Sequence, residues 1–173
     1  MGERSVMVNM GQFAVSRSHE DVLTALGLGS CIAVCVYDPD SQLGGMVHVV
    51  LPDSAIGRPA DTPAKFADSG VPWLIRHVEE QGAARRRLRI SLVGGANVLT
   101  SGAGPSALDI GQRNIAAVRG ALAAERLVAV AEDVGGHSSR TVRLRIRTGE
   151  LMVKTLRDGE ALFASLGGAD GGR

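Results

Sequence analysis

The sequence predicts a single-domain α/β (α+β-like) fold, a layered sandwich with mixed β-sheets and two main helices. Three observations lead to this fold class. Short apolar runs of strand length fill the first third of the chain, two later segments carry the apolar spacing of amphipathic helices, and further short strands follow. This order is not the regular strand–helix alternation of a doubly wound fold, so mixed sheets are favoured. The 173 residues, 45% of them hydrophobic, are enough for one buried core.

The central strands are predicted in the N-terminal third of the chain. A first short strand is expected within residues 6–15, and an apolar run follows over 22–28. The runs Cys31–Tyr37 and Leu43–Leu51 flank the turn sequence Asp38-Pro39-Asp40, which predicts an antiparallel strand pair. Both runs are almost entirely apolar, so both strands should be covered on two faces.

Two amphipathic segments predict the helices. For the first helix, Thr62 is a candidate N-cap with Pro63 at the first helical position, and Gly82 is a candidate C-terminal residue. The second helix is predicted from Asp109, which together with Gln112 fits a capping box. The apolar stripe of this second helix consists of Ile115, Val118 and Leu122.

Four more strands complete the predicted domain, which covers residues 1–157. An alternating strand over residues 88–92 precedes the second helix. The other three strands are predicted at Leu127–Val134, Thr141–Arg147 and Glu150–Leu156. Residues 158–173 are expected to form a loose, Gly-rich C-terminal tail.

Charge and composition disfavour several classes of protein. Nineteen basic against eighteen acidic residues give a net charge of +1, and aromatic residues are only 3% of the chain. General nucleic-acid binders carry a larger positive excess and stacking aromatics, so that class is set aside. No apolar stretch is long enough for a membrane span and no signal-peptide pattern is present, so a cytoplasmic protein is expected. Nothing in the sequence demands more than a monomer.

The two cysteines, Cys31 and Cys35, are predicted to be free thiols. On one strand their Cα atoms would lie about 13 Å apart, whereas a disulfide needs less than about 7 Å. Cys31 follows Gly29 and Ser30, and a glycine-containing turn can aim several backbone N–H groups into one space, as an oxyanion hole requires. Cys31 is therefore a candidate nucleophile, with Gly29 and Ser30 as its oxyanion or substrate loop. The alternative is an inert cysteine buried beside a tight turn.

His48 is the candidate base for this thiol. It lies within an apolar run, where packing does not require a histidine, and it can face Cys31 if the two strands are neighbours. A Cys–His pair is the minimal activated thiol. The alternative is a buried histidine whose ring bonds a backbone carbonyl. A zinc site that adds Cys35 and His137 would match no usual ligand spacing, and Ser30 as nucleophile would need a stronger base system.

Six sequence segments carry a resemblance to a known family. They are LGLGSCIAVCVYD (26–38), GGMVHVVLPDS (44–54), KFADSGVPWLI (65–75), LVGGANVL (92–99), DIGQRNI (109–115) and GGHSSRTVRLRIRTGELMVKTL (135–156). Together they resemble the chemoreceptor glutamine deamidase family, CheD, over residues 8–157. The pairing of LGSC with HVVLP, followed by GGAN and IGQRN, is specific to this family.

The resemblance implies a cytoplasmic enzyme that hydrolyses selected glutamine side chains of methyl-accepting chemotaxis receptors to glutamate and releases ammonia. It implies Cys31 as nucleophile and His48 as base, with no metal or organic cofactor. It also implies a layered fold similar to that of deamidating toxin cysteine hydrolases. The helical cytoplasmic region of the receptors would be the substrate, and a CheC-type phosphatase would be a further partner.

One position departs from the family pattern. The family typically has a threonine as third catalytic residue where this chain has Ala25, and Thr24 stands one residue earlier. A local bulge would bring Thr24 into that place. Otherwise a backbone carbonyl would orient His48. Thr24 is taken as the candidate third catalytic residue.

Two other functions fit the same residues. A transglutaminase-like acyltransferase or a peptidase would use the same Cys–His pair. A non-catalytic docking or regulatory module for chemoreceptors or a CheC-type phosphatase would keep the fold without the chemistry. The presence of both Cys31 and His48 argues against such a module, whereas Ala25 leaves it open.

Overall fold

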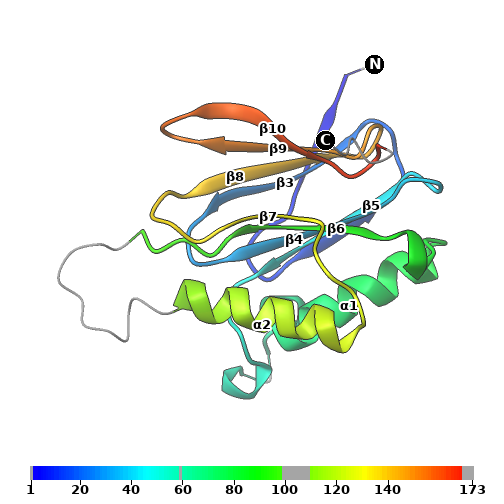
Figure 1. Cartoon of the computed structure of the whole chain (residues 1–173). Helices are drawn as coiled ribbons and strands as arrows, with labels where there is room; N and C mark the ends of the chain where they lie inside the picture. Colours follow the sequence, from blue (N-terminus) through cyan, green and yellow to red (C-terminus); the bar gives the residue numbers. More distant parts are fainter. Residues whose placement is uncertain (1, 59, 99–109, 169–173) are drawn as a thin grey trace.

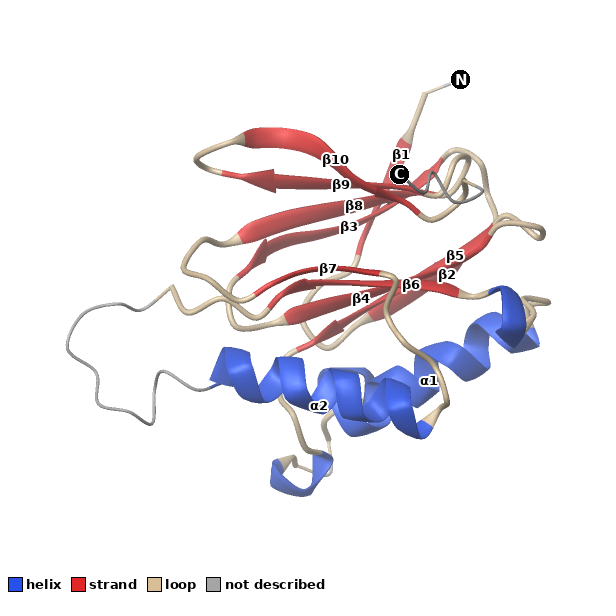
Figure 2. Ribbon diagram, in the orientation of Figure 1, coloured by secondary structure: helices blue, strands red, loops and turns tan. Residues whose placement is uncertain are grey.

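Two five-stranded β-sheets stack face to face, and two helices cover the outer face of one of them (Figures 1 and 2). This computed structural model describes residues 2–58, 60–98 and 110–168. The helices are α1 (Ala67–Glu80) and α2 (Ile110–Ala124). Neither of these described helices has the length and hydropathy needed to cross a membrane. The predicted class, a single-domain layered sandwich with mixed sheets and two main helices, is confirmed.

Each sheet mixes parallel and antiparallel neighbours. In spatial order, the first sheet consists of β1 (Arg4–Met7), β3 (Asp21–Leu28), β8 (Arg140–Arg145), β9 (Glu150–Thr155) and β10 (Gly159–Ser165). The second consists of β2 (Phe13–Ser16), β5 (Leu43–Val49), β4 (Ile32–Asp38), β6 (Arg89–Gly94) and β7 (Ala131–Val134). The pairs β1–β3 and β6–β7 are parallel, whereas β4 pairs antiparallel with both β5 and β6.

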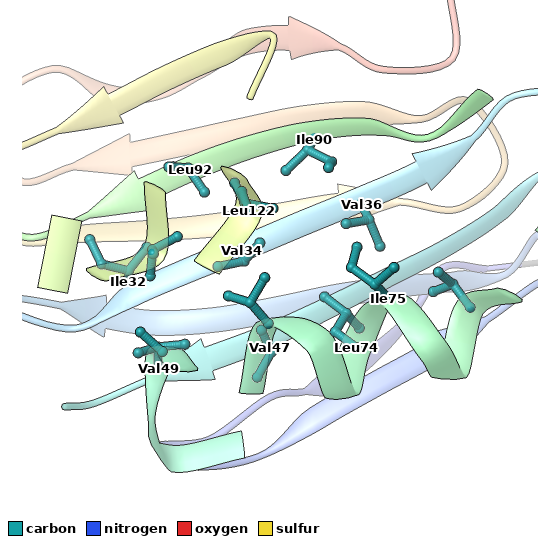
Figure 3. Close-up of a cluster of buried hydrophobic side chains, with 14 of the residues drawn as sticks. Ile32, Val34, Val36, Val47, Val49, Leu74, Ile75, Ile90, Leu92 and Leu122 are labelled. Carbon is teal, nitrogen blue, oxygen red and sulfur yellow. The ribbon is translucent and has the colours of Figure 1, made fainter. Parts of the chain in front are cut away.

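The predicted antiparallel pair is confirmed as β4 and β5, and every residue of both strands is buried. The two faces of β4 serve two different cores. Val34 and Val36 join α1 and α2 in the core of Figure 3, whereas Ala33 and Cys35 pack against the first sheet. A strand that is covered on both faces needs apolar residues at every position, which explains the unbroken apolar run.

Other element boundaries differ from those predicted. Residues 6–15 contribute to two strands, β1 and β2, which lie in different sheets. Pro63 begins only a short 3₁₀ turn, η2 (Pro63–Lys65), because Phe66 is extended, and α1 begins after it. The Thr62 hydroxyl makes no cap bond and instead donates to the carbonyl of Gly11. Gly82 follows α1 with φ +106°, as expected of a residue that ends a helix.

Further differences from the predicted boundaries lie around α2 and in the connections between elements. β7 begins at Ala131, later than predicted. The chain leaves α2 through Arg126, which has φ +59°, and residues 127–129 are in neither helix nor strand. The predicted capping residue Asp109 lies outside the described residues. Two further 3₁₀ turns, η1 (Ser54–Ile56) and η3 (Arg85–Arg87), lie in connections.

The expected loose C-terminal tail is wrong for residues 159–168. Residues 159–165 form β10, which pairs antiparallel with β9 around an irregularity between Leu162 and Ala164. The backbone N–H of Leu166 donates to the carbonyl of Gly149 at 2.8 Å, and its side chain is 1% exposed. Leu166 belongs to the core that includes the first sheet, and Phe163 and Ala164 pack against that core. This packing and the pairing with β9 outweigh the flexibility of the glycines around the segment.

Replacing Leu166 should therefore destabilise the fold as a core substitution does. We expect Leu166→Ala to lower the free energy of unfolding by about 2–4 kcal/mol. Leu162→Ala, on the same terminal segment but at a side chain that is 56% exposed, should change it by less than about 0.5 kcal/mol. Urea unfolding followed by circular dichroism measures both. Equal effects of the two substitutions would contradict the docked position of this segment.

Candidate active site

Cys31 and His48 lie on one face of the second sheet. Cys31 directly precedes β4, and strand alternation gives it the direction of Ala33 and Cys35, toward the first sheet. His48 is the cross-strand partner of Ala33. Cys31 and His48 are therefore diagonal neighbours, an arrangement with about 7–8 Å between Cα atoms and less between side chains. The structure brings the two predicted residues together between the sheets.

The imidazole of His48 is 3% exposed and held through one of its two nitrogens. Nδ1 lies 3.0 Å from the carbonyl oxygen of Val8 and so carries the proton that it donates. Nε2 then bears the lone pair, and it is buried with no hydrogen-bond partner among the described residues. Burial lowers the pKa of His48, and the bond to Val8 partly opposes this shift. The ring is therefore a neutral base with a free acceptor nitrogen.

The segment between β1 and β2 holds this ring. It crosses from the first sheet to the second and passes over the end of β5. The N–H of His48 donates to Gln12 and the N–H of Gly11 donates to His48, both at 3.0 Å. Gly11 has φ +72°, a conformation that suits glycine at the turn of this crossing. This one segment therefore bonds both the ring of His48, through Val8, and its backbone, through Gly11 and Gln12.

The thiol of Cys31 is uncharged in this setting. Its side chain is half-buried, and burial raises the pKa, while the N–H of the same residue lies toward the sulfur and opposes the shift. A buried site favours the neutral forms of both thiol and imidazole. Both shifts favour a resting site in which a neutral thiol faces a neutral imidazole.

The loop at Gly29, Ser30 and Cys31 has its carbonyls turned into the protein. The carbonyl of Gly29 accepts from Ala96 at 2.7 Å and that of Cys31 from Gly95 at 2.8 Å. The N–H groups of Ser30 and Cys31 donate to no backbone carbonyl within the described ranges. These groups are the donors expected of an oxyanion loop.

Close packing of glycines brings this loop against the end of β6. A Cβ atom at Gly94 would lie 2.1 Å from the carbonyl oxygen of Cys31, and Gly94 has φ +122°. A Cβ at Gly111, on α2, would lie 2.5 Å from the carbonyl of Gly95. No larger residue fits at these places. All three glycines lie in the family motifs, but the sequence does not show that Gly94 and Gly95 meet Cys31 or that Gly111 meets Gly95.

Asn114 is a further site residue that the sequence analysis missed. It is fully buried on α2, and its side-chain nitrogen donates to the carbonyls of Ser30 and Val50, both at 2.9 Å. The available signal was an amide side chain on the apolar stripe of the predicted helix, next to Ile115. A buried polar group requires hydrogen-bond partners, but the sequence does not say which ones.

The hydroxyl of Thr24 does not reach His48. It bonds Ser5 Oγ at 3.1 Å and the carbonyl of Val22 at 3.2 Å, on the face of β3 away from the second sheet. The register irregularity of β3 falls between Ala25 and Leu28, so it does not turn Thr24 inward. The carbonyl of Val8 orients His48 instead. Thr24 contributes through its backbone, because its own carbonyl accepts the N–H of Val8 at 2.8 Å.

Among the described residues, no hydrogen bond joins Cys35 or His137 to this pair. Cys35 is completely buried, and burial raises the pKa of its thiol so far that it stays protonated. His137 is exposed, with Nδ1 at 3.0 Å from the carbonyl of Asn97. In the part of the chain that the structure describes, no group of three His, Cys, Asp or Glu residues is arranged to hold a metal ion.

Comparison with known proteins identifies the family. Residues 50–155 match the family model described as CheD chemotactic sensory transduction. The chain is 44% identical over 154 residues to a probable chemoreceptor glutamine deamidase CheD of Symbiobacterium thermophilum, covering 88% of this chain and 93% of that protein. It is 39% identical over 156 residues to the chemoreceptor glutamine deamidase CheD of Thermotoga maritima, covering 90% and 95%. These matches place the chain among proteins of chemotactic sensory transduction. It belongs to the CheD family.

The neutral resting pair predicts a characteristic pH dependence. The rate at which iodoacetamide alkylates Cys31 should rise through and beyond pH about 8.5, the range of an ordinary thiol, because burial raises the pKa. Peptide mass spectrometry separates Cys31 from the buried Cys35, and the urea-unfolded protein is the reference for an unperturbed thiol. A rate that is already at its plateau below pH 7 would show a thiolate–imidazolium pair and contradict this description.

Proposed function

We propose that this chain is a protein-glutamine deamidase, an amidohydrolase that converts glutamine side chains of methyl-accepting chemotaxis receptors to glutamate and releases ammonia. Its two relatives above carry the name chemoreceptor glutamine deamidase. The observation that carries the proposal is the buried imidazole of His48, which is fixed at Nδ1 and unpartnered at Nε2 beside Cys31. This is the arrangement that general-base activation of a thiol needs.

The proposed first step forms a thioester. The sulfur of Cys31 attacks the δ-carbonyl carbon of the glutamine while the thiol proton moves to Nε2 of His48. The N–H groups of Ser30 and Cys31 stabilise the oxyanion of the tetrahedral intermediate. When the intermediate collapses, the C–N bond breaks and His48 returns the proton to the departing nitrogen, which leaves as ammonia.

The proposed second step hydrolyses the thioester. His48, neutral again, takes a proton from water, and the resulting hydroxide attacks the carbonyl carbon. The C–S bond breaks, and the proton on His48 passes to the sulfur, which restores the Cys31 thiol and frees a glutamate side chain. No step requires a metal or an organic cofactor. The lowered pKa of His48 suits this cycle because it keeps the ring neutral between steps.

The surroundings of the site fit a protein substrate. Met10, next to Gly11 at the His48 side, is 70% exposed. Val98, at the Cys31 side, would be 3.4 Å from a Cβ added at Gly29 and is 46% exposed. Apolar side chains on both sides of the pair offer contacts for an amphipathic helix, which the helical cytoplasmic region of a receptor would supply. Family resemblance further predicts a CheC-type phosphatase as partner and a cytoplasmic location, and nothing in the sequence demands more than a monomer; these stay predictions.

A docking or regulatory module is the second candidate function. Its support was Ala25, which lacks the hydroxyl expected of a third catalytic residue. The carbonyl of Val8 supplies the acceptor for Nδ1 that this hydroxyl would supply, so Ala25 does not favour the module. Catalysis on receptors is therefore the function that the site supports best.

Incubation with a receptor cytoplasmic fragment tests the activity. We expect specific glutamines to become glutamates, detected by peptide-level mass spectrometry, together with free ammonia and an intact receptor backbone. Cys31→Ala should lower the rate by at least about 10³-fold, because it removes the nucleophile. Peptide-bond cleavage or amine incorporation would instead indicate a peptidase or an acyltransferase. Receptor binding without any deamidation would favour the docking module.

Thr24→Val tests which group orients His48. The substitution removes a hydroxyl that faces away from the site and leaves the backbone carbonyl in place, so kcat/KM should change by less than about threefold while stability falls by about 1 kcal/mol. His48→Gln is the comparison and should be nearly inactive. A loss for Thr24→Val as deep as that for His48→Gln would place the hydroxyl in the mechanism.

A further inference from the structure

The side chain of Asn114 joins the two chain segments that carry Cys31 and His48. It belongs to the inward stripe of α2, which also carries Gly111, Ile115 and Val118. A carboxamide with no exposed surface in such a stripe loses its hydration, and this costs stability unless the protein supplies hydrogen bonds. Its partners are the carbonyls of Ser30 and Val50. Ser30 directly precedes Cys31, and Val50 is two residues beyond His48.

These two carbonyls need a donor that the sheet does not provide. The β4–β5 ladder ends at the pair Ile32–Val49, and beyond it the N–H of Val50 turns away to bond Lys65. Two carbonyl oxygens cannot bond each other. A carboxamide NH₂ offers two protons from one nitrogen and satisfies both. The reverse orientation of the amide would set its oxygen against two acceptors, so the side chain has one stable orientation.

Anchoring the carbonyl of Ser30 also fixes the N–H of Cys31. Both groups belong to one planar trans peptide unit, in which C=O and N–H point in opposite directions. With the oxygen held on α2, the N–H is directed away from α2, and it lies toward the Cys31 sulfur. The carbonyls of Gly29 and Cys31 are held by backbone donors, so among the described groups only the middle one depends on a side chain.

We propose that Asn114 is a positioning residue for catalysis: it locks the Ser30–Cys31 peptide so that the Cys31 N–H is presented to the oxyanion, and it holds this peptide in register with the end of β5. The proposal rests on the proposed thiol mechanism but not on the identity of the substrate. Its consequence is specific. Reactions of Cys31 that pass through a tetrahedral oxyanion depend on Asn114, whereas reactions of the same sulfur that form no oxyanion do not.

Two small reagents separate these cases without a receptor. 4-Nitrophenyl acetate acylates a thiol through a tetrahedral oxyanion and releases 4-nitrophenolate. Iodoacetamide alkylates the same sulfur by displacement of iodide, with no oxyanion. The ratio of the two second-order rate constants at one pH therefore reports the oxyanion donors independently of thiol accessibility and pKa. The Cys31→Ala protein supplies the background rate for both reagents.

Asn114→Leu and Asn114→Ala are the test variants, with Val118→Ala as the matched control. Val118 is fully buried on the same stripe of α2. We expect both Asn114 variants to lower the acylation rate by about tenfold or more, in line with the loss of an oxyanion donor, and to change the alkylation rate by less than about threefold. Val118→Ala should leave the ratio unchanged even where its loss of stability is similar. Receptor deamidation by the same variants should show the loss in kcat rather than in KM.

Three outcomes would overturn the proposal. One is an acylation rate within about twofold of that of Val118→Ala. Another is an equal fall of acylation and alkylation, which would mean that Asn114 only supports the local fold. Should neither variant fold, NMR of the wild-type protein decides: both Asn114 side-chain amide protons must be protected from solvent exchange, and fast exchange of either would overturn the geometry. One outcome separates this inference from the proposed function. If the ratio of acylation to alkylation is higher in the wild-type protein than in the Asn114 variants but the wild-type protein deamidates no receptor, the proposed function is refuted and this inference stands.

Discussion

The antiparallel register of β4 and β5 is the constraint on which the site depends. Because side chains alternate along a strand, the pairing of Ala33 with His48 puts Cys31 and His48 on one face, and a slip by one residue would turn the histidine into the helical core. The register is strongly fixed because both faces are buried: Val34 and Val47 must meet the helices, while Cys35 and Met46 must meet the first sheet. Two separate apolar cores therefore enforce one placement of Cys31 relative to His48.

The same burial decides the chemistry of the pair. A solvated Cys–His pair could rest as an ion pair, but the layer between the sheets penalises both charges, so the pKa of Cys31 is raised and that of His48 is lowered. Orientation must then come from neutral groups. The carbonyl of Val8 provides it, and Val8 is placed by its own N–H bond to Thr24. A chain of backbone hydrogen bonds thus links the first sheet to the imidazole on the second, and it does so whatever side chain stands at position 25.

Local sequence patterns predicted the parts of the molecule that local physics determines. The paired strands followed from unbroken apolar runs around a turn. Cys31 stood out because it follows the glycine-containing turn at Gly29 and Ser30, and His48 because packing in an apolar run does not require a histidine. The remaining parts depend on contacts between distant residues. Val8 lies far from His48 in the sequence and acts through its backbone carbonyl, a group that every residue has. Its side chain therefore gives no sign of this role.

Asn114 was visible as a polar residue in an apolar stripe. Its partners, Ser30 and Val50, are set by how α2 packs on glycines, which the sequence does not show. β10 was not predicted because the glycines around it suggested flexibility. It forms a strand because it pairs with β9, and that pairing cannot be read from its own residues.

The unpaired nitrogen of His48 argues for chemistry at this site rather than for docking alone. A buried acceptor without a partner costs about 1–3 kcal/mol, and an apolar side chain of similar shape would avoid that cost without disturbing the surface that a partner touches. In the proposed reaction this cost is offset, because the thiol proton of Cys31 and then the proton shared with ammonia or water provide what Nε2 lacks. A site that leaves Nε2 of His48 unsatisfied at rest and turns the carbonyls of the neighbouring loop inward is incomplete by itself. In the proposed reaction the missing component is a carbonyl carbon with an oxygen able to carry negative charge, which a glutamine side chain would supply.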